Sequence, residues 1–96
     1  MVIVYGGISV DPSRVEDVVA AGTVFQQASA AEDGCLEYQL SWKVGEPENL
    51  RLLELWSSVE AHEAHRGQQH TKEWTEFISA AATAPPKFTR HEVREV

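Results

Sequence analysis

The stretch "CLEYQLSWKVGEPENLRLLELWS", residues 35–57, decides the fold. Apolar and polar residues alternate through residues 35–42, and this period of two predicts a strand. One of its faces is expected to carry Leu36, Tyr38, Leu40 and Trp42. Residues 44–49, "VGEPEN", have the composition of a turn, and residues 50–57 form the next strand. Because the connection is short, we expect the two strands to pair as an antiparallel hairpin.

A strand and a helix are expected before this hairpin. Residues 2–10 are short and rich in β-branched side chains, as strands are. Asp11 can cap a helix that has Pro12 at its first position. Apolar residues then follow helical spacing at Val15, Val18, Val19, Gly22 and Phe25. The helix is expected to end at residues 32–34, where Gly34 can take a left-handed conformation.

A second helix and a last strand are expected after the hairpin. Ser57 or Ser58 can open the helix, and Ser57 has the capping-box spacing to Glu60. Gly67 is expected to interrupt this helix, which resumes with His70, Trp74, Phe77 and Ala81 on one face. "APP" stops it, and residues 87–96 form a polar strand. The order β-α-β-β-α-β predicts a ferredoxin-like α+β fold for a single domain, residues 1–96.

Composition excludes several classes of partner. The 96 residues include 15 acidic and 8 basic ones, a formal net charge of −7, which argues against nucleic acid and anionic lipid as partners. No secretory signal and no apolar run of about 20 residues is visible, so we expect no membrane association. Cys35 is the one cysteine and can form no disulfide within the chain. We therefore expect a cytoplasmic protein.

Three of the four histidines lie within residues 59–70, "VEAHEAHRGQQH". The segment "HEAHR" fails the zincin motif, because position 66 is an arginine where that motif requires the second histidine. His62 and His65 could share a helix face, yet a catalytic zinc site usually has three protein ligands. We therefore expect no zinc, iron or copper. No nucleophile elbow surrounds Ser57 or Ser58, and no phosphate-binding loop is present.

The histidines and tryptophans have both structural and functional interpretations. His62 precedes Glu63 on a charged helical segment and is expected to be exposed. His70 would often be an inert histidine at the edge of a core, and tryptophans commonly fill the core of a small domain. Their combination suggests more, because an apolar space with a few polar groups suits a flat organic ligand. The residues expected around that space are Tyr38, Glu54, Trp56, His65, His70 and Trp74.

Two segments, "EDGCLEYQL" and "LLELWSSVEAHEAHRGQQHTKEWTEF", resemble the antibiotic biosynthesis monooxygenase (ABM) domain family. The matching positions are Gly34, Cys35, Leu36, Tyr38, Glu54, Trp56, Ser58, Glu60, Ala61, Ala64, His65 and His70. The resemblance implies a dimeric α+β barrel, in which two ferredoxin-like subunits set their sheets against each other. The family includes oxygenases that act on polycyclic phenols without metal or flavin, haem-degrading enzymes and isomerases of small phosphorylated carbonyl compounds.

The haem-degrading branch can be compared position by position. Its first-strand Asn, its Trp and its axial His resemble the positions of Gly7, His65 and Thr75 in this chain. All three residues differ, so haem degradation is not expected. Tyr5 and Gly7 also provide no first-strand Asn that could orient a phenolate.

The resemblance implies a cofactor-independent monooxygenase that acts, as a homodimer, on an aromatic, polycyclic phenol or quinol-like molecule. His65 or His70 is then the candidate base, Trp56 and Trp74 are ring-packing walls, and Tyr38 and Glu54 orient the substrate. One alternative is a non-catalytic, ligand-binding or stress-associated dimeric module. Another is an isomerase of a small carbonyl compound, which would need an inward-facing arginine among Arg51, Arg66 and Arg90. An open cavity touching a histidine favours an enzyme, whereas a filled core favours the module.

Overall fold

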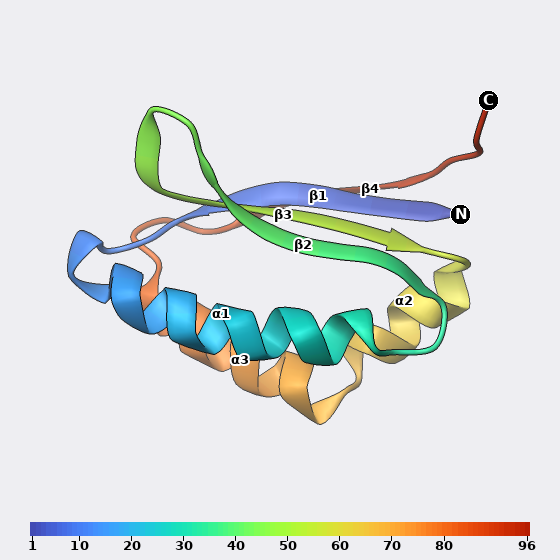
Figure 1. Ribbon diagram of the computed structural model, residues 1–96, viewed down its shortest axis with the longest axis horizontal. Coiled ribbons are helices and arrows are strands. Elements are labelled where there is room, and N and C mark those ends of the chain that lie inside the picture. Colours follow the sequence, from blue (N-terminus) through green and yellow to red (C-terminus); the bar gives the residue numbers. More distant parts are fainter.

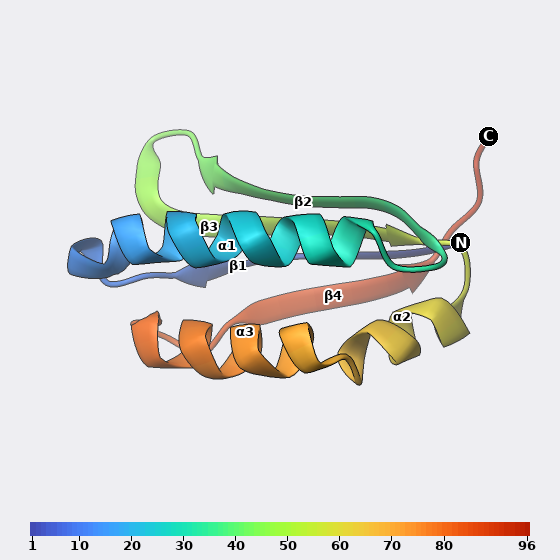
Figure 2. The same cartoon turned by 60° about the horizontal axis from the view of Figure 1, so that its bottom comes forward.

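The computed structural model describes residues 1–96 and shows an antiparallel sheet with helices on one face (Figure 1). The strands have the order β2-β3-β1-β4, and α1 and α3 pack side by side under the sheet (Figure 2). The predicted ferredoxin-like α+β fold is confirmed. The elements are β1 (Val2–Ser9), η1 (Pro12–Arg14), α1 (Val15–Ala30), β2 (Cys35–Lys43), β3 (Glu46–Trp56), α2 (Val59–Arg66), α3 (Gln69–Ala81) and β4 (Lys87–Glu92).

The ends of the helices follow the expected local chemistry. The Asp11 carboxylate accepts a hydrogen bond from the Ser13 amide at 2.9 Å, which caps the 3₁₀ turn that leads into α1. Ser58, rather than Ser57, caps α2 by accepting a hydrogen bond from the Ala61 amide at 3.1 Å. Gly67 separates α2 from α3 as predicted.

Two glycines allow close approaches that bring α1 and α2 against the sheet. A Cβ atom at Gly22 would lie 3.2 Å from a methyl group of Leu40, so α1 packs tightly on β2 at this point. Gly34 has a φ of +80°, a left-handed conformation that favours glycine, and it also faces Ala61 at the start of α2. This turn therefore joins the end of α1 to the region that carries the histidines.

A β-bulge at the start of β2 contradicts the predicted face of one residue. Cys35 pairs with Trp56 and Glu37 pairs with Leu55, so Leu36 is the extra residue between them. Leu36 is consequently 53% exposed, and Cys35 takes the place on the helix-covered face of the sheet. A bulge reverses the alternation of side chains on one side of it, which is why simple periodicity misplaced Leu36.

The core fills the space between the sheet and the helices, and the opposite face of the sheet has no cover in the single chain. Trp56 is 0% exposed and joins Val2, Val4, Phe25 and Tyr38 in one buried cluster. On the uncovered face Tyr5 is 41% exposed. None of the helices combines the length and the apolar composition that a membrane-spanning helix needs.

Candidate functional site

A cavity of about 360 Å³ lies between α3 and β4, with β1 and β3 beneath it. The two ends of this cavity differ in polarity, because neighbouring rows of paired strand residues carry different side chains. One row across the helix-covered face contains Tyr38, Glu54, Val4 and Arg90, and the next contains Leu52, Gly6 and Phe88. The cavity is therefore polar towards α2 and apolar further along α3, where Ile78 lines it. A smaller hollow of about 150 Å³ between α1 and β2 contains no titratable group.

Glu54 is a buried carboxyl group at the polar end of this cavity. Burial raises the pKa of Glu54 to about 7, although the hydrogen bond donated by Trp56 Nε1 at 2.9 Å favours the ionised form. A carboxyl group that changes its protonation near neutral pH can act as a proton donor and as a proton acceptor.

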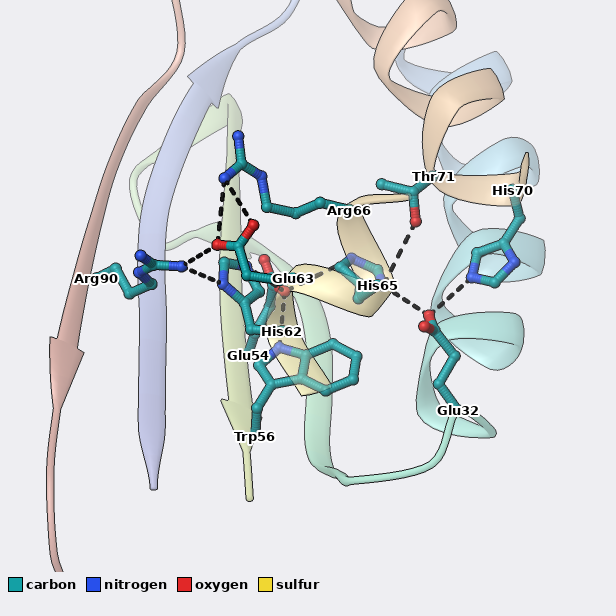
Figure 3. A network of polar contacts seen from close by, with 10 residues as sticks. All are labelled: Glu32, Glu54, Trp56, His62, Glu63, His65, Arg66, His70, Thr71 and Arg90. Carbon is teal, nitrogen blue, oxygen red and sulfur yellow. Dashed lines mark hydrogen bonds and ion pairs between the residues drawn. The ribbon is translucent and has the colours of Figure 1, made fainter. Parts of the chain in front are cut away.

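His65 is held between two carboxyl groups, as Figure 3 shows. Its Nδ1 lies 2.6 Å from Glu32 Oε2, and its Nε2 lies 3.6 Å from Glu54 Oε1. With Glu32 as the acceptor, Nδ1 carries the proton of the neutral ring and Nε2 is free to accept one. Burial lowers the pKa of His65, against the opposing effect of Glu32. His65 therefore has the geometry of a general base whose orientation is fixed by a carboxylate.

His62 is buried, and the prediction that it would be exposed is wrong. Its relative exposure is 7%, because it shares the inward face of α2 with His65 while Glu63 points outward. Arg90 Nη1 donates to His62 Nδ1 at 3.1 Å, so Nε2 carries the proton of the neutral ring and lies 3.8 Å from Glu54 Oε1. Burial, and then the charge of Arg90, lower the pKa of His62.

The structure separates the other predicted site residues into two groups. Tyr38 and Trp74 line the cavity, and the ring of Trp74 stacks on Phe25 with centroids 4.9 Å apart. Burial raises the pKa of Tyr38, so its phenol stays protonated. Trp56 and His70 do not line the cavity. Trp56 lies in the core, and the side chain of His70 is 29% exposed, with Nε2 2.8 Å from Glu32 Oε2.

The sequence did not place three residues that complete this arrangement, Glu32, His62 and Phe88, and it suggested Arg90 only for the isomerase alternative. For His62 the signal was its i, i+3 spacing to His65. For the last strand it was alternation, since Phe88 and Arg90 share the face that covers the cavity. Nothing local identifies Glu32, which lies 33 residues before His65 in the chain.

Glu32, His65 and His70 are the residues that could hold a metal ion, because their ligand atoms lie within 4.8 Å of one another. The two nitrogens are 2.6 and 2.8 Å from the same oxygen, which is hydrogen-bonding geometry. Donor atoms around one zinc ion with bonds of about 2.1 Å lie more than 3 Å apart, so these side chains would have to separate. The absence of a metal stays a prediction.

The positions compared with the haem-degrading branch differ in their relation to the cavity. Tyr5 and Gly7 point to the uncovered side of the sheet, whereas Val4 and Ile8 line the cavity. His65 and Thr75, the other two positions of that comparison, both line the cavity.

The raised pKa of Glu54 predicts a pH-dependent loss of stability. The folded chain keeps the proton up to about pH 7, whereas the unfolded chain releases it near 4.5. This contribution to stability is therefore complete below pH 4.5 and is lost as the pH rises through about 7. His62 and His65 have lowered pKa values and act in the opposite direction, losing stability as the pH falls below 6.5.

The Glu54→Gln variant isolates the effect of this carboxyl group, because both histidines remain. We expect the free energy of unfolding of the variant, relative to the parent, to rise by about 2–3 kcal/mol between about pH 5 and pH 8. Urea unfolding at the two pH values measures it, and Glu60→Gln on the exposed side of α2 is the control. If the difference in the free energy of unfolding between variant and parent is the same at both pH values, the pKa of Glu54 is not raised.

Comparisons with known proteins agree with this fold and identify the family. Residues 1–76 match the family described as "Antibiotic biosynthesis monooxygenase". The chain is 28% identical to the "Putative monooxygenase YcnE" of Bacillus subtilis over 95 residues, which cover 99% of this chain and 100% of that protein.

Solved structures give the same result for the fold. A "putative antibiotic biosynthesis monooxygenase" from Deinococcus radiodurans matches with a TM-score of 0.92 and 25% identity, covering 100% of this chain and 95% of that one. Another with the same description, from Nitrosomonas europaea, matches with a TM-score of 0.91 and 18% identity over 97% of this chain and 98% of that one. This chain is therefore a member of the antibiotic biosynthesis monooxygenase family.

Proposed function

We propose that this chain is a cofactor-independent monooxygenase that acts on an aromatic, polycyclic phenol or quinol-like molecule. The family assignment and the names of the relatives support a monooxygenase-type function. The observation that carries the finer proposal is the buried end of the cavity, where His65 Nε2 and the Glu54 carboxyl group lie 3.6 Å apart.

The cavity suits a flat apolar molecule. Trp74, held in place by its stack on Phe25, forms one wall, and Leu52 and Phe88 belong to the sheet on the other side. A volume of about 360 Å³ lies within the usual range of small-molecule sites. Such a molecule would place its hydroxyl or its acidic C–H group at the polar end, near His65.

The proposed reaction uses the substrate itself as the reductant of dioxygen. His65 Nε2 removes a proton from an anthrone-like substrate and leaves an electron-rich anion. This anion transfers one electron to dioxygen, and the two radicals combine in a C–O bond to give a peroxide. Protonation of the peroxide and loss of water convert the CH₂ group into a ketone, with the second oxygen atom released in the water. No external electron donor is needed, because the four electrons come from the substrate carbon.

Glu32 and Glu54 have different roles in the proposed proton transfers. Glu32 holds His65 in the tautomer that accepts a proton at Nε2. Glu54 can return a proton to the peroxide, since the pKa of Glu54 is raised to about 7 by burial. The phenol of Tyr38 stays protonated and can donate a hydrogen bond to the substrate.

Oxygen uptake tests the proposal. The protein, treated with chelator and free of flavin, is incubated with a panel of anthrones and hydroquinones while dissolved oxygen is recorded. We expect enzyme-dependent uptake with at least one polycyclic member. His91→Ala is a matched control, because His91 lies beside Tyr5 on the uncovered side of the sheet. If no member raises uptake above the protein-free rate, the proposal fails.

The alternative functions differ in what the cavity must do. A non-catalytic binding module agrees less well with an open cavity that touches His65. One observation supports the isomerase alternative. Arg66 and Arg90 both line the cavity, whereas Arg51 does not. The isomerase alternative predicts hydrogen exchange next to the carbonyl group of a small substrate in D₂O without oxygen uptake.

A homodimer formed through the uncovered face of the sheet is also proposed. Tyr5 and Leu53 are paired neighbours on that face, with the half-buried Ile3 and Leu55 beside them. Burial of these side chains favours association. Sedimentation at micromolar concentration should show twice the mass of one chain. Leu53→Lys should give the single-chain mass, while Leu36→Lys, at the exposed bulge, should not. A parent that sediments as a single chain contradicts this.

A further inference from the structure

Two arginines stand at the polar end of the cavity and share one outward-facing glutamate. Arg90 Nη1 lies 2.6 Å from Glu63 Oε1, and Arg66 Nη1 lies 3.4 Å from both carboxylate oxygens of Glu63. Figure 3 shows that Glu63 lies between the two guanidinium groups. Both arginines line the cavity, whereas Glu63 does not. Arg66, Arg90 and Glu63 come from α2 and β4, the two elements that border this end of the cavity.

We propose that Arg66 and Arg90 form a binding site for a carboxylate on the aromatic ligand, and that this carboxylate takes the place of Glu63. The inference rests on the proposed function, since the ligand's ring system is placed in the same cavity. It narrows the substrate class from aromatic phenols in general to aromatic acids.

The charges around the cavity support an anionic ligand. The chain as a whole has a formal net charge of −7, yet this cavity is lined by two arginines and by one acidic residue, Glu54. Glu54 stays partly neutral near pH 7 because burial raises its pKa. The positive charge of the arginines is compensated mainly by Glu63, from outside the cavity. A ligand carboxylate could take the place of this partner, because the displaced Glu63 carboxylate is exposed and can be solvated by water.

The geometry of the arginines also fits a carboxylate. Guanidinium groups bind carboxylates through paired N–H donors, and the contacts to Glu63 use a single nitrogen, Nη1, of each arginine. Arg90 Nη1 also donates to the buried His62, which holds this guanidinium at the cavity. Glu63 is exposed and lies on the outer side of α2, so its side chain can swing into solvent when it is displaced.

Calorimetric titration with two matched probes tests the site. The probes are 2-naphthoate and 2-naphthalenemethanol, which share a ring system and differ in the anionic group. Each is titrated into the parent protein and into the Arg66→Gln, Arg90→Gln and Glu63→Gln variants. Arg94→Gln is the control, because Arg94 lies in the exposed tail after β4. Circular dichroism checks that every variant is folded.

We expect the parent to bind 2-naphthoate more tightly than the alcohol, with an advantage that falls as salt is raised. Arg66→Gln and Arg90→Gln should each weaken naphthoate binding about fivefold or more and leave the alcohol nearly unchanged. Glu63→Gln should tighten naphthoate binding, since the competing carboxylate is gone. If the contacts of Glu63 with the two arginines are only a surface ion pair, Glu63→Gln should leave the affinity for naphthoate unchanged.

Two results would overturn the inference. One is a parent that binds naphthoate no better than the alcohol, including the case in which it binds neither. The other is a Glu63→Gln variant without tighter naphthoate binding. Oxygen uptake separates this test from the proposed function. If the protein takes up oxygen with a neutral anthrone but does not prefer naphthoate, only the proposed carboxylate site is wrong. A preference for naphthoate with the expected response of the variants, but without uptake, removes only the monooxygenase.

Discussion

The His65→Ala variant is expected to lose about 10²-fold or more of the oxygenase rate, the usual contribution of a positioned general base. The ring is buried, Glu32 fixes its tautomer, and its free nitrogen is directed towards Glu54 and the cavity. The loss should appear in kcat rather than in KM, because the proton transfer is a step of the reaction and the ring walls of the cavity remain.

Three other histidine variants show whether the loss of rate is specific to His65. His70→Ala should have a smaller effect, because His70 does not line the cavity and acts only through Glu32. His62→Ala should also lower the oxygenase rate, since His62 is buried beside Glu54. His91→Ala should leave the rate unchanged. A His65→Ala variant with the parent's turnover of a confirmed substrate would show that the base lies elsewhere.

Trp56→Ala is expected to lower the free energy of unfolding by about 3–5 kcal/mol, the range for removal of a large buried aromatic side chain. Trp56 is 0% exposed, and its ring packs against Tyr38 and His65. Its indole N–H also donates to the buried carboxyl group of Glu54, which would be left without that partner.

Urea unfolding compares this variant with Trp56→Phe, which keeps an aromatic ring but lacks the N–H donor. Trp56→Phe should cost less, about 1–3 kcal/mol, mainly from the unpaired group at Glu54. Trp42→Ala, at a half-buried position near the end of β2, should cost less than Trp56→Ala. A loss below about 1 kcal/mol for Trp56→Ala would contradict the assignment of this residue to the core.

Most of the fold could be predicted because each element has its own local signal. The alternation around Tyr38 and the turn at Gly45 identify the β2–β3 hairpin, Gly67 marks the end of α2, and Gly34 lies in the turn between α1 and β2. These features depend on neighbours in the chain. The bulge at Leu36 could not be predicted, since an extra residue leaves the apolar pattern almost unchanged while it reverses the faces.

The site was harder to predict, because its contacts join residues that are distant in the chain. The resemblance to a family and the sheet–helix arrangement led to His65, Glu54, Tyr38 and Trp74, which the structure places on one cavity. The orientation of α2 about its axis decides that His62 faces inward, whereas the i, i+3 spacing shows only that His62 and His65 share one face of the helix. The contact of Glu32 with His65 and that of Arg90 with His62 could not be predicted, since each forms only through the tertiary fold.

The source of the oxygen atom in the product distinguishes a monooxygenase reaction from hydration by water. Anthrone is converted by chelator-treated, flavin-free protein under ¹⁸O₂ in ordinary water, and the product is analysed by mass spectrometry. We expect one labelled oxygen atom to enter each ketone formed, and we expect the His65→Ala variant to form this product about 10²-fold more slowly. A product that takes its new oxygen only from water, or that forms equally fast without the protein, would contradict the proposed monooxygenase reaction.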